Sequence, residues 1–256
     1  MLRVIPRLDI KGPNLIKSIS FEGLRVLGDP ATFARRYYAG GADELLFMDT
    51  VASLYQRQQF IEIINSVAAE VFIPIIVGGG IRSLEDMETM LRNGADKLGI
   101  NTAAVRNPDL ITQGAEAFGT QCMVLSIEAK KVAPGKWECY TDNGREQSGL
   151  DAVQWAVRGE ELGAGEILVT SVDNDGTRSG FDAELIRSVR RAVSVPVIAS
   201  GGAGKPDDIV RLYGDADPSA ACVATMLHYG VTDIAALKNA LADAGVKVRR
   251  PQRDMP

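Results

Sequence analysis

A motif that occurs twice, 122 residues apart, constrains the fold of this chain more than any other feature. An apolar run at residues 73–77 leads into glycines, and a second run at residues 195–199 does the same, with Pro74 matched by Pro196. Glycines after a buried strand leave no Cβ beside the backbone, so their N–H groups can approach an anion. The chain therefore contains the same strand and glycine turn in each half.

The repeat extends beyond this motif. Residues 41–47 are matched at the same offset by residues 163–169, and Asp9 is matched by Glu128 at an offset of 119. Such extended self-similarity is typical of a duplicated structural unit. We therefore expect two related half-domains, at about residues 1–121 and 122–250.

Eight apolar runs alternate with segments that carry helix signals. The runs are rich in Val, Ile, Leu and Ala, which is typical of parallel strands covered on both faces. The pairs Asp29–Pro30 and Asn107–Pro108 each predict an N-cap followed by proline at the first helical position, and Ser83 predicts another cap. The predicted strands are residues 4–9, 44–49, 73–77, 97–100, 122–128, 166–171, 197–200 and 220–224.

This alternation predicts an α/β fold, a (βα)8 TIM barrel built from two duplicated (βα)4 halves, as one domain over residues 1–256. A doubly wound open sheet is the alternative, and the duplication favours closure. Two connections are long, residues 11–28 and residues 131–149. We expect the first to be a loop over the mouth of the barrel and the second to contain a small hairpin turning at Asn143–Gly144.

Composition excludes several classes of protein. Asp and Glu outnumber Lys and Arg by 33 to 28, so the chain lacks the excess of positive charge that would predict nucleic-acid binding. No signal peptide or membrane-spanning run is present, and three cysteines without metal-ligand spacing predict free thiols in the cytoplasm. With His228 as the one histidine, which we interpret as structural, we expect no metal site and no cofactor.

Carboxylates end the first strand of each predicted half. Asp9 and Glu128 would face each other across one cavity, the arrangement needed for a general acid and a general base. The alternative is that each forms an ion pair with a neighbouring lysine, namely Lys11, Lys17 or Lys130. We predict that both carboxylates are catalytic, because active sites form at the carboxyl ends of barrel strands.

Two glycine turns, each beside a threonine at the end of the next strand, predict two opposed phosphate-binding sites. A substrate with a phosphate at both ends would match them. The candidate residues are Gly79, Gly80, Asn101 and Thr102 for one site and Asp175, Gly176, Thr177, Ser200, Gly201, Gly202, Ala224 and Thr225 for the other.

Charged residues also begin four of the predicted strands, at Arg3, Glu44, Lys97 and Glu166. Their alternating sign predicts a charged ring at the bottom of the barrel. Solubility of exposed strand ends is the alternative explanation.

Together these motifs resemble the cyclase subunit family of imidazole-glycerol-phosphate synthase over residues 2–249. The matching segments are residues 8–9, 28–30, 41–44, 77–81, 94–97, 100–105, 163–166, 175–177 and 199–204. The resemblance implies a barrel that receives ammonia from a glutaminase subunit docked beneath it, at the N-terminal face. It implies conversion of a bisphosphate ribulose-formimino-aminoimidazole-carboxamide ribonucleotide to imidazole glycerol phosphate and aminoimidazole carboxamide ribonucleotide.

The resemblance also assigns roles. It implies Asp9 as a catalytic carboxylate, Lys17 on a mobile first loop, and phosphate contacts at both glycine turns. It further implies that Arg3, Glu44, Lys97 and Glu166 form a salt-bridged gate for ammonia.

Three residues depart from the family pattern. Glu128 stands where the family has aspartate, Arg7 where a small or thiol side chain is usual, and Ile76 where threonine is typical. Residues 11–17 and 51–57 look more like divergent paralogues associated with amidination of cell-surface sugars. The sequence leaves three functions open: the cyclase, the sugar-pathway paralogue, and a non-catalytic barrel that activates a glutaminase. The presence of Asp9 and both glycine sites argues against the third.

Overall fold

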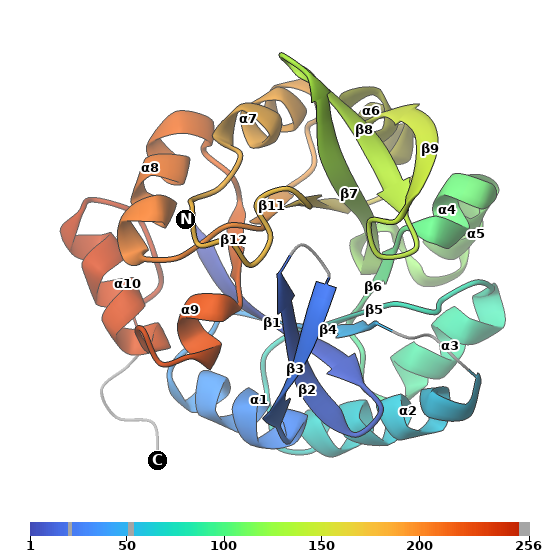
Figure 1. The fold of residues 1–256 in the computed structure, drawn as a ribbon. Helices are drawn as coiled ribbons and strands as arrows, with labels where there is room; N and C mark the ends of the chain where they lie inside the picture. The colour runs from blue at the N-terminus through green and yellow to red at the C-terminus, as the bar shows by residue number, and fades with distance from the viewer. Residues whose placement is uncertain (20–21, 51–53, 251–256) are drawn as a thin grey trace.

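Eight parallel strands close into a barrel with helices around it in a computed structural model, which describes residues 1–19, 22–50 and 54–250 (Figure 1). The barrel strands are β1 (Arg3–Lys11), β4 (Leu45–Asp49), β5 (Ile75–Gly78), β6 (Lys97–Ile100), β7 (Met123–Ala133), β10 (Glu166–Ser171), β11 (Val197–Ser200) and β12 (Ala220–Val223). The predicted (βα)8 barrel is confirmed, and residues 51–53 of the segment 51–57 lie outside the described residues.

Closure follows from the hydrogen-bonded order of the strands. β1 pairs in parallel with both β12 and β4, and β7 pairs in parallel with both β6 and β10. β1 and β7 are thus four strands apart in either direction around the barrel. The first strands of the two predicted halves face each other across the interior, as the duplication requires.

Helices cover the outside of the barrel (Figure 1). They are α1 (Pro30–Ala39), α2 (Leu54–Ala68), α3 (Leu84–Arg92), α4 (Thr102–Arg106), α5 (Asp109–Phe118), the 3₁₀ helix η1 (Thr120–Cys122), α6 (Ala152–Glu161), α7 (Ala183–Ala192), α8 (Pro206–Ala216), α9 (Thr225–His228) and α10 (Ile234–Asp243). Their apolar faces and the outward side chains of the strands form one large buried core.

Two of the three predicted caps are confirmed. Asp29 accepts a hydrogen bond from the backbone N–H of Thr32, and Ser83 accepts one from Asp86. The cap predicted at Asn107 is wrong, because α4 ends at Arg106 and Asn107 is its C-cap residue, so Pro108 takes the N-cap position of α5 without a side-chain bond.

The connection after β1, expected as a loop, is a β-hairpin. β1 continues two residues beyond Asp9, and Gly12, with a φ of 57°, turns the chain back. β2 (Asn14–Ile19) then pairs antiparallel with β1 and with β3 (Glu22–Gly28). The predicted second hairpin is confirmed as β8 (Lys136–Thr141) and β9 (Glu146–Asp151), and both hairpins lie in front of the barrel in Figure 1.

Alternation along β1 separates the interior from the outer core. Val4 and Leu8 belong to the core beneath the helices, whereas Ile5 belongs to a small apolar cluster drawn from seven barrel strands. Because side chains alternate across a strand, Arg3, Arg7 and Asp9 share the inner face with Ile5. The interior therefore has charged residues above and below an apolar layer.

A buried lysine connects the last helix to the first strands of the barrel through a hydrogen bond and an ion pair. Lys238 of α10 has no solvent exposure, and its Nζ donates to Gly41 O at 2.7 Å and contacts Asp43 Oδ2 at 2.8 Å. Asp43 also accepts from the backbone N–H of Val4 at 2.8 Å and binds Arg249 at 2.9 Å. This network joins residues that are some two hundred positions apart in the chain.

We expect Lys238→Met to lower the free energy of unfolding by about 3 kcal/mol, because it leaves the buried Asp43 carboxylate with less compensation. Urea unfolding of both proteins measures the difference. The matched control is Arg158→Met, since the ion pair of Arg158 with Glu161 is exposed and should contribute little. Equal effects of the two substitutions would contradict a structural role for Lys238.

Candidate active site

Four buried charged side chains form a chain of ion pairs at the mouth. Arg7 Nε donates to Asp9 Oδ1 at 2.8 Å, and Lys17 Nζ lies 3.8 Å from Asp9 Oδ2 and 3.2 Å from Asp175 Oδ2. Arg7 also reaches Thr170 Oγ1 on β10, at 3.4 Å. The predicted catalytic residues Asp9 and Lys17 thus lie together, and the ion-pair alternative for Asp9 with Lys17 holds as well.

Glu128 has a different environment. It lies on the inner face of β7, opposite β1, and is 4% exposed. Its Oε2 accepts a hydrogen bond from the backbone N–H of Gly144, at 2.8 Å, in the turn between β8 and β9. One carboxylate is therefore bound to cations and the other to a backbone dipole.

The two environments separate the pKa values. Burial alone would raise the pKa of Asp9, but Arg7 and Lys17 outweigh burial and hold that pKa below its usual value. Burial raises the pKa of Glu128 from 4.5 to about 7, although the charge of Arg7 partly offsets this. A carboxyl that titrates near neutral pH is suited to proton transfer.

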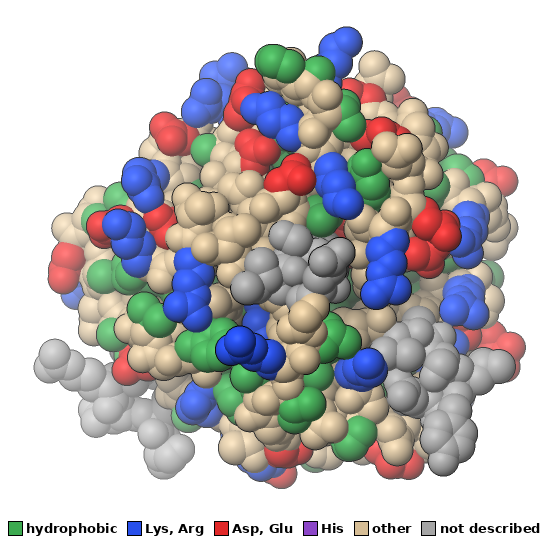
Figure 2. Space-filling view, viewed as in Figure 1, with side chains coloured by type: hydrophobic (Ala, Val, Ile, Leu, Met, Phe, Trp, Pro, Cys, Tyr) green, Lys and Arg blue, Asp and Glu red, His purple; other side chains and the backbone are tan. Residues whose placement is uncertain are grey.

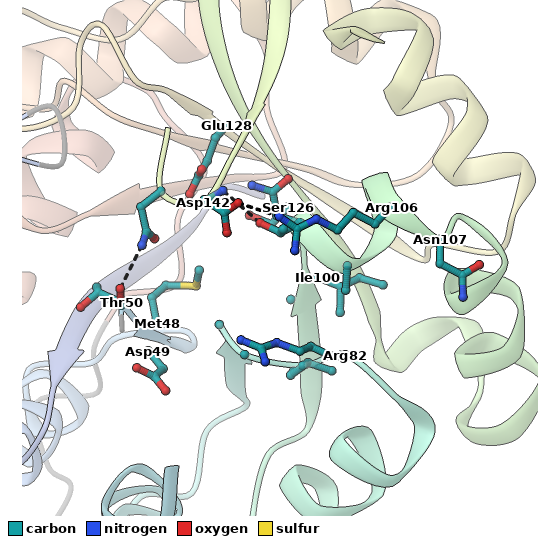
Figure 3. Close-up of a pocket in the computed structure, with 18 residues that line it drawn as sticks. Met48, Asp49, Thr50, Arg82, Ile100, Arg106, Asn107, Ser126, Glu128 and Asp142 are labelled. Carbon is teal, nitrogen blue, oxygen red and sulfur yellow. Dashed lines mark hydrogen bonds and ion pairs between the residues drawn. The ribbon is translucent and has the colours of Figure 1, made fainter. Parts of the chain in front are cut away.

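A cavity of about 340 Å³ opens beside Glu128 (Figure 3). The predicted residues Gly79, Gly80, Asn101 and Thr102 line it. Gly79 has a φ of 91°, and a Cβ there would collide with the backbone of Asp49, so only glycine fits. Arg82 and Arg106 lie on opposite sides of the open space in Figure 3 and supply positive charge.

The turn between β8 and β9 closes one side of this cavity. Asp142, Asn143 and Gly144 have φ values of 49°, 58° and 71°. Asp142 N donates to Thr102 Oγ1 at 3.0 Å, and Asn143 Nδ2 donates to Thr50 O at 2.9 Å. The turn thereby links Glu128 to the walls of the first glycine site.

The second glycine site is narrow, with a cavity of about 10 Å³. The residues that line it include the predicted Asp175, Gly176, Ser200, Gly201, Gly202, Ala224 and Thr225, together with Arg7 and Cys222. Thr177 is apart from this lining, because its exposed hydroxyl bonds within its own loop, to Asn174 O at 2.7 Å and to Ser179. The remaining members of the predicted set are brought together.

The predicted ring at the bottom of the barrel is present. Lys97 Nζ lies 3.1 Å from Glu44 Oε2 and 2.8 Å from Glu166 Oε2, and Arg3 bonds the other oxygen of each glutamate. Each cation contacts both carboxylates, so the four side chains form a closed ring. Its two glutamates are about 5% exposed, which excludes simple surface solubility as the explanation.

Several residues of the site carry no signal in the sequence. Arg82, Arg106 and Asp142 line the larger cavity, but they lie on loops and short helices without a distinctive motif. The two-residue spacing of Arg7 from Asp9 predicts that both side chains lie on the inner face of one strand, which the structure confirms. The carboxylate bonded to Arg7 is Asp9 on the same strand rather than Glu128.

His228 lies close to the site without lining either cavity. Its Nδ1 hydrogen-bonds the hydroxyl of Tyr37, and burial lowers its pKa to about 4.

Among the described residues there is no cluster of three or more His, Cys, Asp or Glu that could hold a metal ion. Within the same part of the chain, no helix has the length and apolar character needed to cross a bilayer.

The fold and the site together define a (βα)8-barrel enzyme with two buried carboxyl groups between two glycine turns. Residues 3–233 match the family model described as histidine biosynthesis protein. The chain belongs to this family.

Curated relatives include proteins named imidazole glycerol phosphate synthase subunit HisF. The one from Legionella pneumophila is 61% identical over 207 residues, which cover 81% of this chain and 98% of the relative. Those from Bacillus cereus and Dehalococcoides mccartyi are 48% and 49% identical over 247 residues, 96% of this chain and 97–98% of the relatives. The resemblance to the cyclase subunit family is confirmed.

We expect the free energy of unfolding of Glu128→Gln, relative to that of the parent protein, to increase as the pH rises. A carboxyl whose pKa is higher when folded stabilises the protein below its unfolded pKa, here about 4.5, and loses this effect as the pH rises to about 7. The stability of the variant relative to the parent should therefore rise by roughly 3 kcal/mol between pH 4.5 and 8.

Urea unfolding at several pH values measures this difference. Glu62→Gln, a substitution of an exposed glutamate on α2, serves as the control and should show little pH dependence. A constant difference between Glu128→Gln and the parent would contradict the assigned environment of Glu128.

Proposed function

We propose that the chain is the ammonia-dependent cyclase/lyase barrel of an imidazole-glycerol-phosphate synthase. Its substrate is the bisphosphate ribulose-formimino-aminoimidazole-carboxamide ribonucleotide. With glutamine-derived ammonia, the products are imidazole glycerol phosphate and aminoimidazole carboxamide ribonucleotide. The observation that carries the proposal is the placement of Asp9 and Glu128 on opposite strands, between two glycine turns.

Each part of the site has a role in this proposal. The turns at Gly79–Gly80 and Gly201–Gly202 bind the two phosphates, assisted by the hydroxyls of Thr102 and Thr225. Asp9 and Glu128 handle charge and protons at the reacting centre between them. Lys17, carried by the β2–β3 hairpin, brings a cation over this centre. Figure 2 shows Lys and Arg side chains, interspersed with Asp and Glu, on the face of the barrel that carries the mouth.

The relatives' name as a synthase subunit implies a partner, and we propose a glutaminase at the N-terminal face. Two apolar side chains support this placement, since Met1 and Phe72 precede barrel strands and are each 77% exposed. The ring of Arg3, Lys97 and the two glutamates lies at the same face and would be the gate for ammonia. Three free cysteines suit the reducing cytoplasm as the site of the reaction.

One observation favours a second function, the use or delivery of ammonia in amidination of a surface sugar. Arg7 places a cation in the interior, beside the small second cavity. An altered acceptor would account for this departure and for Glu128. Assay of the wild-type protein on the histidine-pathway intermediate with ammonium discriminates the two functions, because only the cyclase forms imidazole glycerol phosphate.

We expect Asp9→Asn to lower ammonium-dependent turnover by about 10²- to 10⁴-fold, the usual effect of losing an acid, a base or its charge. Supplying free ammonium removes any requirement for the partner. Asp207→Asn, a substitution of an exposed carboxylate on α8, is the control and should keep full turnover. Near-normal turnover by a folded Asp9→Asn protein would rule out the assignment.

We also expect inorganic phosphate to bind on both sides of the mouth. Crystals soaked in phosphate should contain one ion near Gly80 and Thr102 and one near Gly202 and Thr225. Thr102→Val should weaken the first ion and Thr225→Val the second, so each variant controls for the other. Density at neither position in the wild-type protein would contradict the paired sites.

A further inference from the structure

Five ionisable side chains at the centre of the site are almost completely buried. The cations are Arg7 and Lys17, and the carboxyl groups are Asp9, Asp175 and Glu128, with exposed fractions between 3% and 5%. An unpaired buried charge is costly, so a buried cluster of ionisable side chains is most stable when its positive and negative charges are equal in number. Two cations balance two carboxylates, so one carboxyl group is left to carry a proton.

The contacts identify which carboxyl group this is. Arg7 bonds Asp9 at 2.8 Å, and Lys17 lies 3.2 Å from Asp175 while remaining within 3.8 Å of Asp9. Asp9 and Asp175 therefore have the short contacts to cations. The bond of Glu128 is to the backbone N–H of Gly144, which compensates a negative charge less than a guanidinium does.

The other titratable groups near these five do not alter the balance. The charged side chains that line the larger cavity with Glu128 are two of each sign, Arg82 and Arg106 with Asp49 and Asp142. Cys222 on β12 lies near Arg7, and burial raises the pKa of its thiol to about 12, so it stays neutral. His228 of α9 also stays neutral, because burial lowers its pKa to about 4. Glu128, with a pKa raised to about 7, is the carboxyl that titrates in the neutral range.

The side chain that enforces this division is Arg7. It lies two residues before Asp9 on the same inner face of β1, so its guanidinium meets the Asp9 carboxylate from below. Its reach to Thr170 on β10 fixes it across the interior. Without Arg7, Asp9 would keep Lys17 at 3.8 Å but lose its closer cation, and the like charges of Asp9 and Glu128 would interact more strongly.

We propose that Arg7 is a positioning residue that keeps Asp9 ionised, so that Glu128 is the catalytic residue that carries the proton during turnover. This division of roles rests on the proposed function, and it assigns separate roles to the two carboxylates that the sequence predicts as a general acid and a general base. Asp9 is then a fixed negative charge that stabilises positive charge developing on the substrate. Glu128 is the acid and, after giving up its proton, the base.

The proton balance can be written for condensation of ammonia with the ketone of the substrate. The nitrogen forms a bond to the carbonyl carbon, and the carbon–oxygen bond breaks as water leaves. The departing oxygen takes one proton from Glu128 and one from the nitrogen. The nitrogen returns a second proton to the Glu128 carboxylate, which restores the starting state.

Titration followed by carboxyl ¹³C NMR tests the charge assignment without substrate. Asp9→Asn and Glu128→Gln assign the two resonances. In the wild-type protein, we expect Glu128 to titrate near pH 7 and Asp9 to titrate below the usual range of an aspartate. In Arg7→Met, both midpoints should move up by at least about one pH unit, the usual effect of losing a neighbouring opposite charge.

Three further variants complete the titration. Arg7→Lys keeps the charge and should retain midpoints close to those of the wild type. Arg7→Gln provides a second neutral side chain if Arg7→Met does not fold. Arg158→Met removes an exposed arginine and should change neither midpoint. Titration of wild-type Glu128 in the ordinary carboxyl range, or unchanged midpoints in the neutral Arg7 variants, would overturn the proposal.

The pH dependence of turnover with ammonium separates a positioning role from substrate binding. We expect the midpoint of kcat to follow the titration of Glu128 upward in Arg7→Met and to return in Arg7→Lys. A higher KM with an unchanged kcat profile would make Arg7 a phosphate-binding residue of the second site and overturn the proposal. Absence of turnover in the wild-type protein would reject the proposed function, while the NMR titration still decides the charge assignment.

Discussion

The interior of a closed barrel is the constraint on which this structure depends. Every second residue of a barrel strand faces a space that other strands enclose, so any charge placed there must find its partner inside. On β1 this rule stacks Arg3, Ile5, Arg7 and Asp9 in one column. Arg3 completes its pairing in the lower ring, and Arg7 completes it at the mouth, with an apolar layer between them.

The same rule gives different chemistry to two positions that the repeat makes equivalent. Asp9 has a guanidinium directly below it on its own strand, whereas the residue in that place on β7 is Ser126. A serine carries no charge, so burial raises the pKa of Glu128, and the more distant charge of Arg7 and the N–H of Gly144 offset burial only in part. Arg7, together with Lys17, thereby separates the pKa values of two carboxyl groups at equivalent positions of the repeat.

The sequence predicted the barrel because the strands are apolar runs that end in glycine or polar residues. The bounds of β6, β10 and β11 agree with the predicted residues 97–100, 166–171 and 197–200. Errors arose where a neighbour decides the local structure. The β2–β3 hairpin depends on pairing with an extended β1, and the role of Asn107 depends on where α4 ends.

The candidate site was predictable to the extent that each residue stands at a strand end. Asp9, Glu128, both glycine turns and the lower ring all follow from that position. The hydrogen bond from Arg7 to Asp9 could not be predicted from the sequence, because the spacing puts two side chains on one face without showing which of them bond. Thr177 was included by its sequence neighbours, but its loop directs the hydroxyl to Asn174 instead.

The two glycine sites have similar backbones but very unequal volumes, about 340 Å³ and about 10 Å³. Arg7 and Cys222 line the smaller site, whereas Gly79, Gly80 and Gly99, which have no side chains, line the larger one. The two turns occupy equivalent positions of the repeat, but the side chains around them differ. The two sides of the mouth are therefore not interchangeable, although the repeat alone would make them so.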